Sequence, residues 1–124
     1  MIPVAMPSNC CGGGIRATTT AEVIQEFAHV RASRRSRVEA AQLARQYITG
    51  LGPLIEFEPA DLFDGLDLFE NSTSLGSFDA VLAAVARRRG WAIASADVEF
   101  GRIDGLLYHN PATTTFLQDL MTMG

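Results

Sequence analysis

The chain has 124 residues, which fits one domain of ordinary size. Hydrophobic residues make up 48% and charged residues 19%, a composition typical of a globular core and not of a disordered chain. The formal net charge of −4 means that overall charge does not indicate a nucleic-acid partner. The two cysteines are adjacent, at positions 10 and 11, which argues against a disulfide scaffold and against a zinc site.

The first fourteen residues differ from the rest of the chain. Residues 1–14 are rich in Pro, Cys and Gly, contain no acidic residue and show little apolar periodicity, so we expect a disordered leader. They lack the basic start and apolar run of a signal peptide, and no apolar run approaches the roughly 20 residues that span a bilayer. We therefore expect a cytoplasmic protein that does not enter a membrane.

The spacing of apolar residues predicts alternating strands and helices between residues 15 and 111. In chain order we predict a strand at 15–19, helices at 20–32 and 40–51, a strand at 54–57, helices around 62–69 and 80–86, strands at 92–95 and 106–108, and a short helix around 116–121. This order predicts an α/β sandwich with a mostly parallel sheet. We expect residues 112–124 to form a C-terminal tail or a short helix.

Three acidic residues stand at the ends of these elements. Glu22 lies near the start of one helix, Asp79 opens another, and Asp97 ends the apolar run 91–96. Helix starts and strand ends meet at one edge of a parallel α/β sheet, where such folds place ligands. Several carboxylates without a compensating Lys suggest a hard divalent cation, Mg²⁺ or Mn²⁺.

Each of these acids also has a purely structural explanation. The segment Thr19–Glu22 matches a capping box, in which the Glu side chain reaches back to the N-cap backbone. Ser77 can cap the helix that Asp79 opens, and an acid in a first turn complements the helix dipole. Asp97 fits an ordinary turn. Asp79, however, adjoins a helix that is apolar nearly all round, where a desolvated carboxylate is costly unless a cation or donor meets it.

The acidic motifs and their intervening helices resemble the PIN-domain ribonucleases, most closely toxins of the VapC type. The resemblance runs from about residue 15 to residue 111 and rests on three segments, Thr20–Arg31, Ser77–Ala84 and Ser95–Leu106. It implies a PIN-like α/β/α sandwich in which Glu22, Asp79 and Asp97 bind the metal. Ser95 matches a Ser or Thr that forms a hydrogen bond within that site.

The resemblance also implies a reaction and partners. A metal-activated water would cleave phosphodiesters of structured RNA, such as tRNA or rRNA, in a type II toxin–antitoxin system. A VapB-type antitoxin would block the acidic groove, and the protein would form a homodimer.

The chain departs from the family pattern at its beginning. The family begins with an apolar strand that ends in Asp, the first metal ligand, and residues 1–14 hold no such Asp. We therefore expect the N-terminal strand and helix of the family to be missing from this chain. We expect a chain with this beginning to cleave RNA poorly. The alternative is a truncated, non-catalytic module that binds the antitoxin.

Other polar residues have weaker functional interpretations. Glu26 lies one helical turn beyond Glu22, and a solvated face is the favoured explanation for it. Glu99 fits a solvated turn better than a residue that orients water, and His29 fits a helix surface. The arginines in 31–37 either solvate a turn or contact RNA phosphates. Phospho-acceptor receiver domains and haloacid-dehalogenase-type phosphatases are disfavoured, because the chain has no Lys and no Asp-x-Asp after its first strand.

Overall fold

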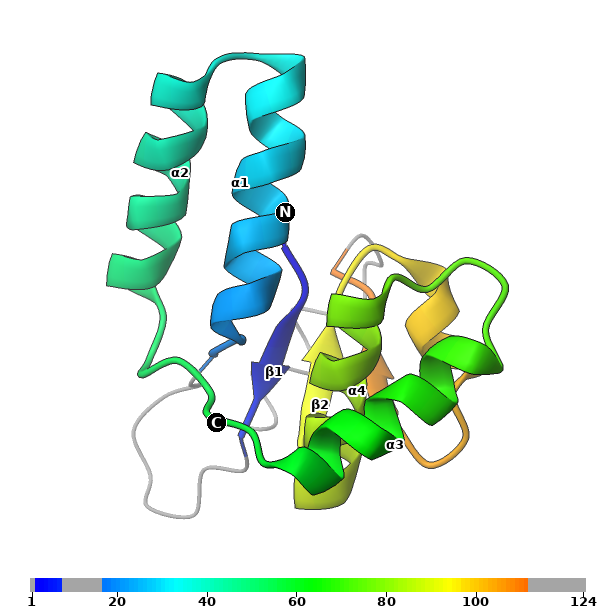
Figure 1. Cartoon of the computed structure of the whole chain (residues 1–124). Helices are drawn as coiled ribbons and strands as arrows, with labels where there is room; N and C mark the ends of the chain where they lie inside the picture. The colour runs from blue at the N-terminus through cyan, green and yellow to red at the C-terminus, as the bar shows by residue number, and fades with distance from the viewer. Residues whose placement is uncertain (1, 8–16, 112–124) are drawn as a thin grey trace.

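The computed structural model describes residues 2–7 and 17–111, in which four α-helices pack against a small sheet (Figure 1). The helices are α1 (Ala21–Arg34), α2 (Arg37–Gly50), α3 (Pro59–Glu70) and α4 (Ser77–Arg89). The strands are β1 (Val4–Met6), β2 (Ala92–Ala94) and β3 (Leu107–His109), and a 3₁₀ turn, η1 (Val98–Arg102), lies between β2 and β3. The predicted α/β fold is confirmed.

The sheet has the strand order β1-β2-β3, with β2 in the centre. β1 runs antiparallel to β2 and pairs Ala5 with Ile93, whereas β3 runs parallel to β2 and pairs Tyr108 with Ile93. All three residues of β2 are buried, as expected for a strand that is covered on both faces. Isolated bridges continue the pairing beyond β1, from Ala5 to Thr18 and from Thr20 to Ile55.

Three predictions about strands are corrected by this sheet. The described strands form one antiparallel pair and one parallel pair, so the prediction of a mostly parallel sheet is wrong for them. The strand predicted at 15–19 appears only as bridges at Thr18 and Thr20, and residues 15–16 lie outside the described ranges. The strand predicted at 54–57 is a single bridge at Ile55.

The prediction of a disordered leader is wrong for residues 2–7. Ile2, Ala5 and Met6 are buried, and β1 lies beside the central strand. Short apolar side chains that pair with β2 bury enough surface to hold this segment, although it is too short to show a periodicity in the sequence. Residues 8–14 of the leader, the tail 112–124 and the helix predicted around 116–121 lie outside the described residues.

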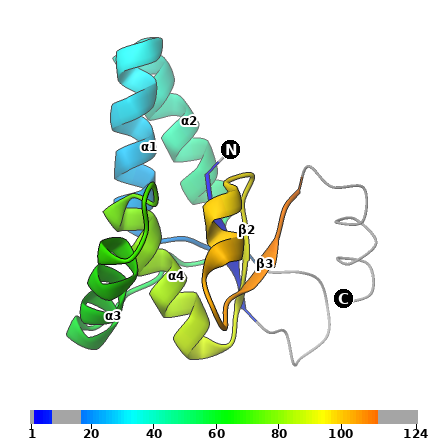
Figure 2. The same ribbon diagram turned by 90° about the vertical axis from the view of Figure 1, so that its right-hand side faces the viewer.

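Helix α4 is the central element of the core. Its residues Ala80–Ala86 are all buried, and it lies between α3 and the sheet (Figure 2). Gly90 ends the helix in the left-handed conformation with φ of 71°, which turns the chain directly into β2. A helix that is apolar all round therefore occupies the buried position that its sequence predicts.

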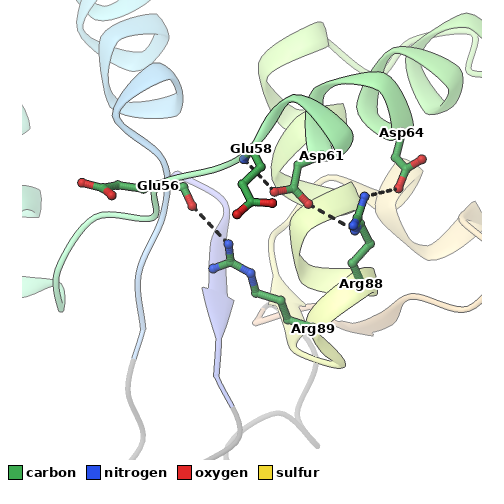
Figure 3. Close-up of polar contacts among 6 residues, drawn as sticks. All are labelled: Glu56, Glu58, Asp61, Asp64, Arg88 and Arg89. Atoms are coloured by element: carbon green, nitrogen blue, oxygen red, sulfur yellow. Dashed lines mark hydrogen bonds and ion pairs between the residues drawn. The ribbon is translucent and has the colours of Figure 1, made fainter.

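Helices α3 and α4 cross at close range, and the crossing depends on a glycine. A β-carbon on Gly65 would lie 2.6 Å from Cγ2 and 2.7 Å from Cα of Val81. A polar network holds the same two helices together (Figure 3): Arg88 of α4 bridges Asp61 at 3.3 Å and Asp64 at 3.0 Å. Asp61 is buried, and the Arg88 partner offsets the cost of burying its charge.

Helices α1 and α2 form a hairpin that projects away from the sheet (Figure 1). An edge-to-face contact between Phe27 and Tyr47, with ring centroids 5.2 Å apart, packs one helix on the other. Arg31 Nη2 bridges Glu39 Oε1 at 2.7 Å near the turn.

The crossing of α3 and α4 gives a first testable prediction. Gly65→Ala should lower the free energy of unfolding by roughly 1–3 kcal/mol or more, because the new methyl group overlaps backbone as well as side chain of Val81. Gly50→Ala, with no atom within 4 Å of the new β-carbon, is the matched control and should be neutral or slightly stabilising. Urea unfolding measures both variants. If Gly65→Ala unfolded with the same free energy as Gly50→Ala, α3 and α4 would be able to move apart without a loss of stability.

Candidate metal-binding site

The turn between α4 and β2 brings two of the predicted acids to one end of the sheet. Because the chain reverses at Gly90, α4 runs antiparallel to the strand that follows, and its first turn lies beside the end of β2 (Figure 2). Asp79 is the third residue of α4, and Asp97 comes three residues after β2. This edge of the sheet is therefore where the two carboxylates meet.

The start of α1 excludes the capping box as an explanation for Glu22. The N-cap is Thr20, whose Oγ1 accepts a hydrogen bond from the Val23 backbone N–H at 3.2 Å. Glu22 is therefore the second residue of the helix and does not occupy the third position that a capping box needs. Among the described residues, Oε2 of Glu22 is buried without a hydrogen-bond partner.

Glu26, one turn further along α1, approaches the start of α4. Its Oε1 lies 3.7 Å from the position that a β-carbon on Gly76 would take, and Gly76 is the N-cap of α4. No side chain caps α4 at this residue. A carboxylate from another helix thus stands beside the exposed backbone N–H groups of α4, which favour negative charge.

The electrostatics of Asp79 identify the acids that share its surroundings. Burial, then the charge of Glu26 and then that of Asp97 raise the pKa of Asp79 from 3.8 to about 6. Glu22 is not among the causes. Since like charges raise a carboxyl pKa only at short range, Glu26 and Asp97 both lie near Asp79, and we call these three residues the acidic cluster.

The turn that carries Asp97 is fixed by three hydrogen bonds. Asp97 Oδ1 accepts from the Glu99 backbone N–H at 3.0 Å, and Ser95 Oγ accepts from the Asp97 backbone N–H at 3.1 Å. The hydroxyl of Tyr108 on β3 donates to the Ser95 carbonyl at 2.8 Å. Burial and the nearby Asp97 charge raise the pKa of Tyr108, which keeps that hydroxyl a donor. Ser95 therefore orients the backbone of Asp97.

Glu99 is already engaged in the interactions of this turn. It forms an ion pair with Arg102 at 2.8 Å and accepts a hydrogen bond from Ser72 at 3.4 Å. Its side chain therefore connects η1 to the loop before α4.

The structure adds an acid to the set that the sequence predicts. Glu26 and Asp97 both act on Asp79, so Glu26 joins the acidic cluster, and the ligand set Glu22, Asp79 and Asp97 stays a prediction. The sequence did carry a signal for Glu26, since it lies four residues after Glu22 and hence on the same face of α1. We interpreted that face as solvated because the position of α4 could not be predicted.

The acidic cluster fits a hard cation in its chemistry and falls short of a complete metal centre in its geometry. Within residues 2–7 and 17–111, no ion pair joins Glu26, Asp79 or Asp97 to an arginine, so a cation would relieve their repulsion. Carboxylate oxygens are the ligands that Mg²⁺ and Mn²⁺ prefer. Residues 2–7 and 17–111 contain no group of three or more His, Cys, Asp or Glu side chains that are placed to hold a metal ion. Strand β1 contributes no carboxylate.

Comparison with known proteins defines the class. A family model described as PIN domain matches residues 12–106, which is most of the chain. The chain therefore belongs to the PIN-domain family. Ribonuclease VapC7 of Mycobacterium tuberculosis is 47% identical to it over 102 residues, which cover 78% of this chain and 68% of the relative. The predicted resemblance to VapC-type PIN proteins is confirmed.

The raised pKa of Asp79 predicts a specific dependence of stability on pH. The folded state holds this proton up to about pH 6 while the unfolded state releases it near 3.8, so stability is lost as pH rises through that window. The total loss is at most roughly 3 kcal/mol. Asp79→Asn removes the charge, so its advantage over wild type should grow between about pH 4 and about pH 7.

Urea unfolding at several pH values measures this difference. Asp67→Asn, on the exposed surface of α3, is the matched control and should show no such pH-dependent gain. A constant difference between Asp79→Asn and wild type across the window would contradict the acidic cluster.

Proposed function

We propose that this protein is a metal-dependent endoribonuclease that cleaves RNA phosphodiesters with a metal-activated water, and that it acts as the toxin of a type II toxin–antitoxin system in the cytoplasm. The observation that carries the proposal is the acidic cluster of Glu26, Asp79 and Asp97, in which burial and like charges raise the pKa of Asp79 to about 6. The name of the similar protein, Ribonuclease VapC7, supports the same chemistry.

Asp79 and Asp97, with Glu22 as the further ligand that the family resemblance implies and Glu26 beside them, would supply carboxylates to Mg²⁺ or Mn²⁺. When bound, the metal lowers the pKa of a coordinated water and stabilises charge on the phosphoryl oxygens. Asp79 is mostly ionised near neutral pH, since its pKa is about 6, and is then able to bind a cation. Ser95 and Tyr108 hold the turn that orients Asp97. The protein residues thus position ligands, and no side-chain nucleophile is needed.

The charge of the helical hairpin supports an RNA substrate. The segment 31–45 carries one acid, Glu39, and five arginines, although the whole chain is acidic. The arginines are Arg31, Arg34, Arg35, Arg37 and Arg45. Arg31 is paired with Glu39, which leaves the others to contact phosphates of a structured tRNA or rRNA.

Two protein partners belong to the proposal. A VapB-type antitoxin would cover the acidic cluster, and a second copy of the chain would form a homodimer through α3. The outer face of α3 exposes four large apolar side chains, which favours burial against another surface. They are Leu62, Phe63, Leu66 and Phe69.

A non-catalytic antitoxin-binding module is the second candidate. It is supported by the geometry of the acidic cluster, since no three acids in the part of the chain that the structure describes are placed to hold a metal ion. The same assay separates the two candidates.

The central test is cleavage of a structured RNA with Mg²⁺ or Mn²⁺ and with EDTA. We expect cleavage that EDTA abolishes. Asp79→Asn, Asp97→Asn and Glu26→Gln should each lower kcat/KM about 100-fold or more, since each removes a charge that stabilises the reacting centre. Glu22→Gln, at the remaining acid that the sequence predicts as a ligand, shows whether Glu22 or Glu26 completes the site.

Controls distinguish chemistry from binding. The Asp79→Asn variant should still bind RNA, and binding should weaken as salt rises, as expected for phosphate contacts. A loss from Glu22→Gln as large as that from Glu26→Gln would restore the set of ligands predicted from sequence. Absence of cleavage with either metal, together with retained binding of a VapB-type antitoxin, would favour the non-catalytic module.

The homodimer has its own test. Phe63→Glu should shift the protein from dimer to monomer in light scattering, because it places a charge on the apolar face of α3. Val38→Glu on α2 is the matched control, since Val38 and Phe63 are both 70% exposed. A wild-type monomer at high concentration, or equal dissociation by both variants, would refute an interface at α3.

A further inference from the structure

A groove of about 350 Å³ lies between the end of α3, the last turn of α4 and the 3₁₀ turn η1, and we call it the η1 groove. One end is next to the acidic cluster, because Glu99 lines the groove and donates its backbone N–H to Asp97 at 3.0 Å. Arg87 marks the other end, since it follows Asp79 by eight residues on α4 and hence by about 12 Å along the helix. The η1 groove thus extends away from the proposed reaction centre by roughly the length of a nucleotide or two.

The charged side chains of the η1 groove balance one another. Arg87 and Arg102 supply two guanidinium groups, and Glu99 and Asp104 supply two carboxylates. The acids disfavour a free phosphate, and the arginines disfavour a metal ion or an amine, because like charges repel at short range. The η1 groove therefore matches a neutral ligand that presents hydrogen-bond donors on one edge and acceptors on another.

Arg87 and Asp104 lie side by side and keep most of their hydrogen-bonding groups for a ligand. Arg87 Nη1 donates to the backbone carbonyl of Asp104 at 3.4 Å, which is longer than a typical hydrogen bond. Gly105, with φ of 79°, turns the chain beside Arg87, whose Cδ lies 3.6 Å from the position of a β-carbon on that glycine. A guanidinium has five donors, so the others stay available. Among the described residues, no ion pair or hydrogen bond engages the Asp104 carboxylate.

Two half-buried apolar side chains complete the η1 groove. Leu68 of α3 and Ile103 after η1 are the apolar residues of its lining. Proteins that bind an unstacked base hold its flat ring between apolar side chains and read its edges by hydrogen bonds. The volume is at the lower end of the range for ligand pockets, about 300–1,000 Å³, which suits one base with its ribose.

We propose that the η1 groove binds a guanine base of the RNA, next to the nucleotide that lies at the acidic cluster. Guanine presents two acceptors, O6 and N7, to a guanidinium, and two donor groups, N1–H and the N2 amine, to a carboxylate. It therefore matches Arg87 and Asp104 with two bidentate contacts, and no other RNA base presents both pairs. That the guanine belongs to an RNA substrate rests on the proposed function.

Nucleotide binding tests the site without cleavage. In EDTA, titration with GMP should give saturable NMR shifts of the amides of Ser72, Asp104 and Gly105, and GMP should bind roughly tenfold more tightly than AMP, CMP or UMP. Inosine monophosphate lacks the N2 amine, and 7-deaza-GMP lacks N7. Each should bind roughly fivefold or more weakly than GMP, because each loses half of one bidentate contact.

Variants test the two side chains that carry the specificity. Asp104→Asn replaces one acceptor by a donor, and Arg87→Lys keeps the charge but loses the planar fork, so each should weaken GMP binding roughly tenfold and leave AMP binding unchanged. Asp67→Asn and Arg34→Lys, at exposed positions on α3 and α1, are the matched controls and should bind GMP as wild type does. Amide spectra show that each variant is folded.

Cleavage separates this proposal from the nuclease itself. In an RNA that wild type cleaves, replacement of guanine by inosine beside the cleaved bond should lower kcat/KM roughly fivefold or more for wild type and not for Asp104→Asn. Equal affinity for the four nucleotides, unchanged GMP binding in both variants, or cleavage that is indifferent to inosine would overturn the guanine site and leave the nuclease intact. Guanine-selective binding by a protein that cleaves no RNA would support the site and refute the nuclease.

Discussion

The packing of α4 against β2 is the constraint on which the rest of the structure depends. Because α4 is buried on all sides and the chain reverses at Gly90, the helix has to lie antiparallel to the central strand, and its first turn has to reach the end of that strand. Asp79 is thereby placed in half-buried surroundings close to Asp97 and to Glu26 of α1. A sheet of three short strands is enough to support this arrangement, since α4 supplies many of the buried side chains of the core.

The acidic cluster carries a cost that a structural role does not explain. Burial disfavours the charge of Asp79, and two further carboxylates lie near it. In the described ranges, the ion pairs of Arg31, Arg88 and Arg102 go to other acids. Arg88, for example, holds α3 to the far end of α4 through Asp61 and Asp64. A fold that neutralises a buried acid at one end of α4 and leaves like charges together at the other is typical of a protein that keeps an acidic site for a cation.

The sequence predicted those parts of the fold that depend on local pattern. The four long helices and the apolar character of Ala80–Ala86 follow from apolar spacing, and the structure contains these helices and buries these residues. The strand Val4–Met6 was not predicted, because three residues give no period and their partner in β2 is about ninety residues away in sequence. The same limit applies to the sheet, whose antiparallel ladder depends on that contact.

The candidate site was predicted in part for a related reason. Asp79 and Asp97 are close in sequence to the turn that joins them, so their meeting could be inferred from the chain order. The choice between Glu22 and Glu26 depends on how α1 crosses the start of α4, which is a tertiary contact without a local signal. The structure adds Glu26 to the acidic cluster, and Glu22 lies one helical turn before it on α1.

The most direct test of this account is a carboxyl NMR titration of Asp79. Wild type should titrate near pH 6, and Glu26→Gln and Asp97→Asn should each lower the pKa of Asp79, whereas Glu22→Gln should leave it unchanged. Saturating Mg²⁺ should lower it further, since the cation favours the charged form. An Asp79 that titrates near 3.8 in wild type, or that responds to Glu22→Gln and not to Glu26→Gln, would contradict the acidic cluster.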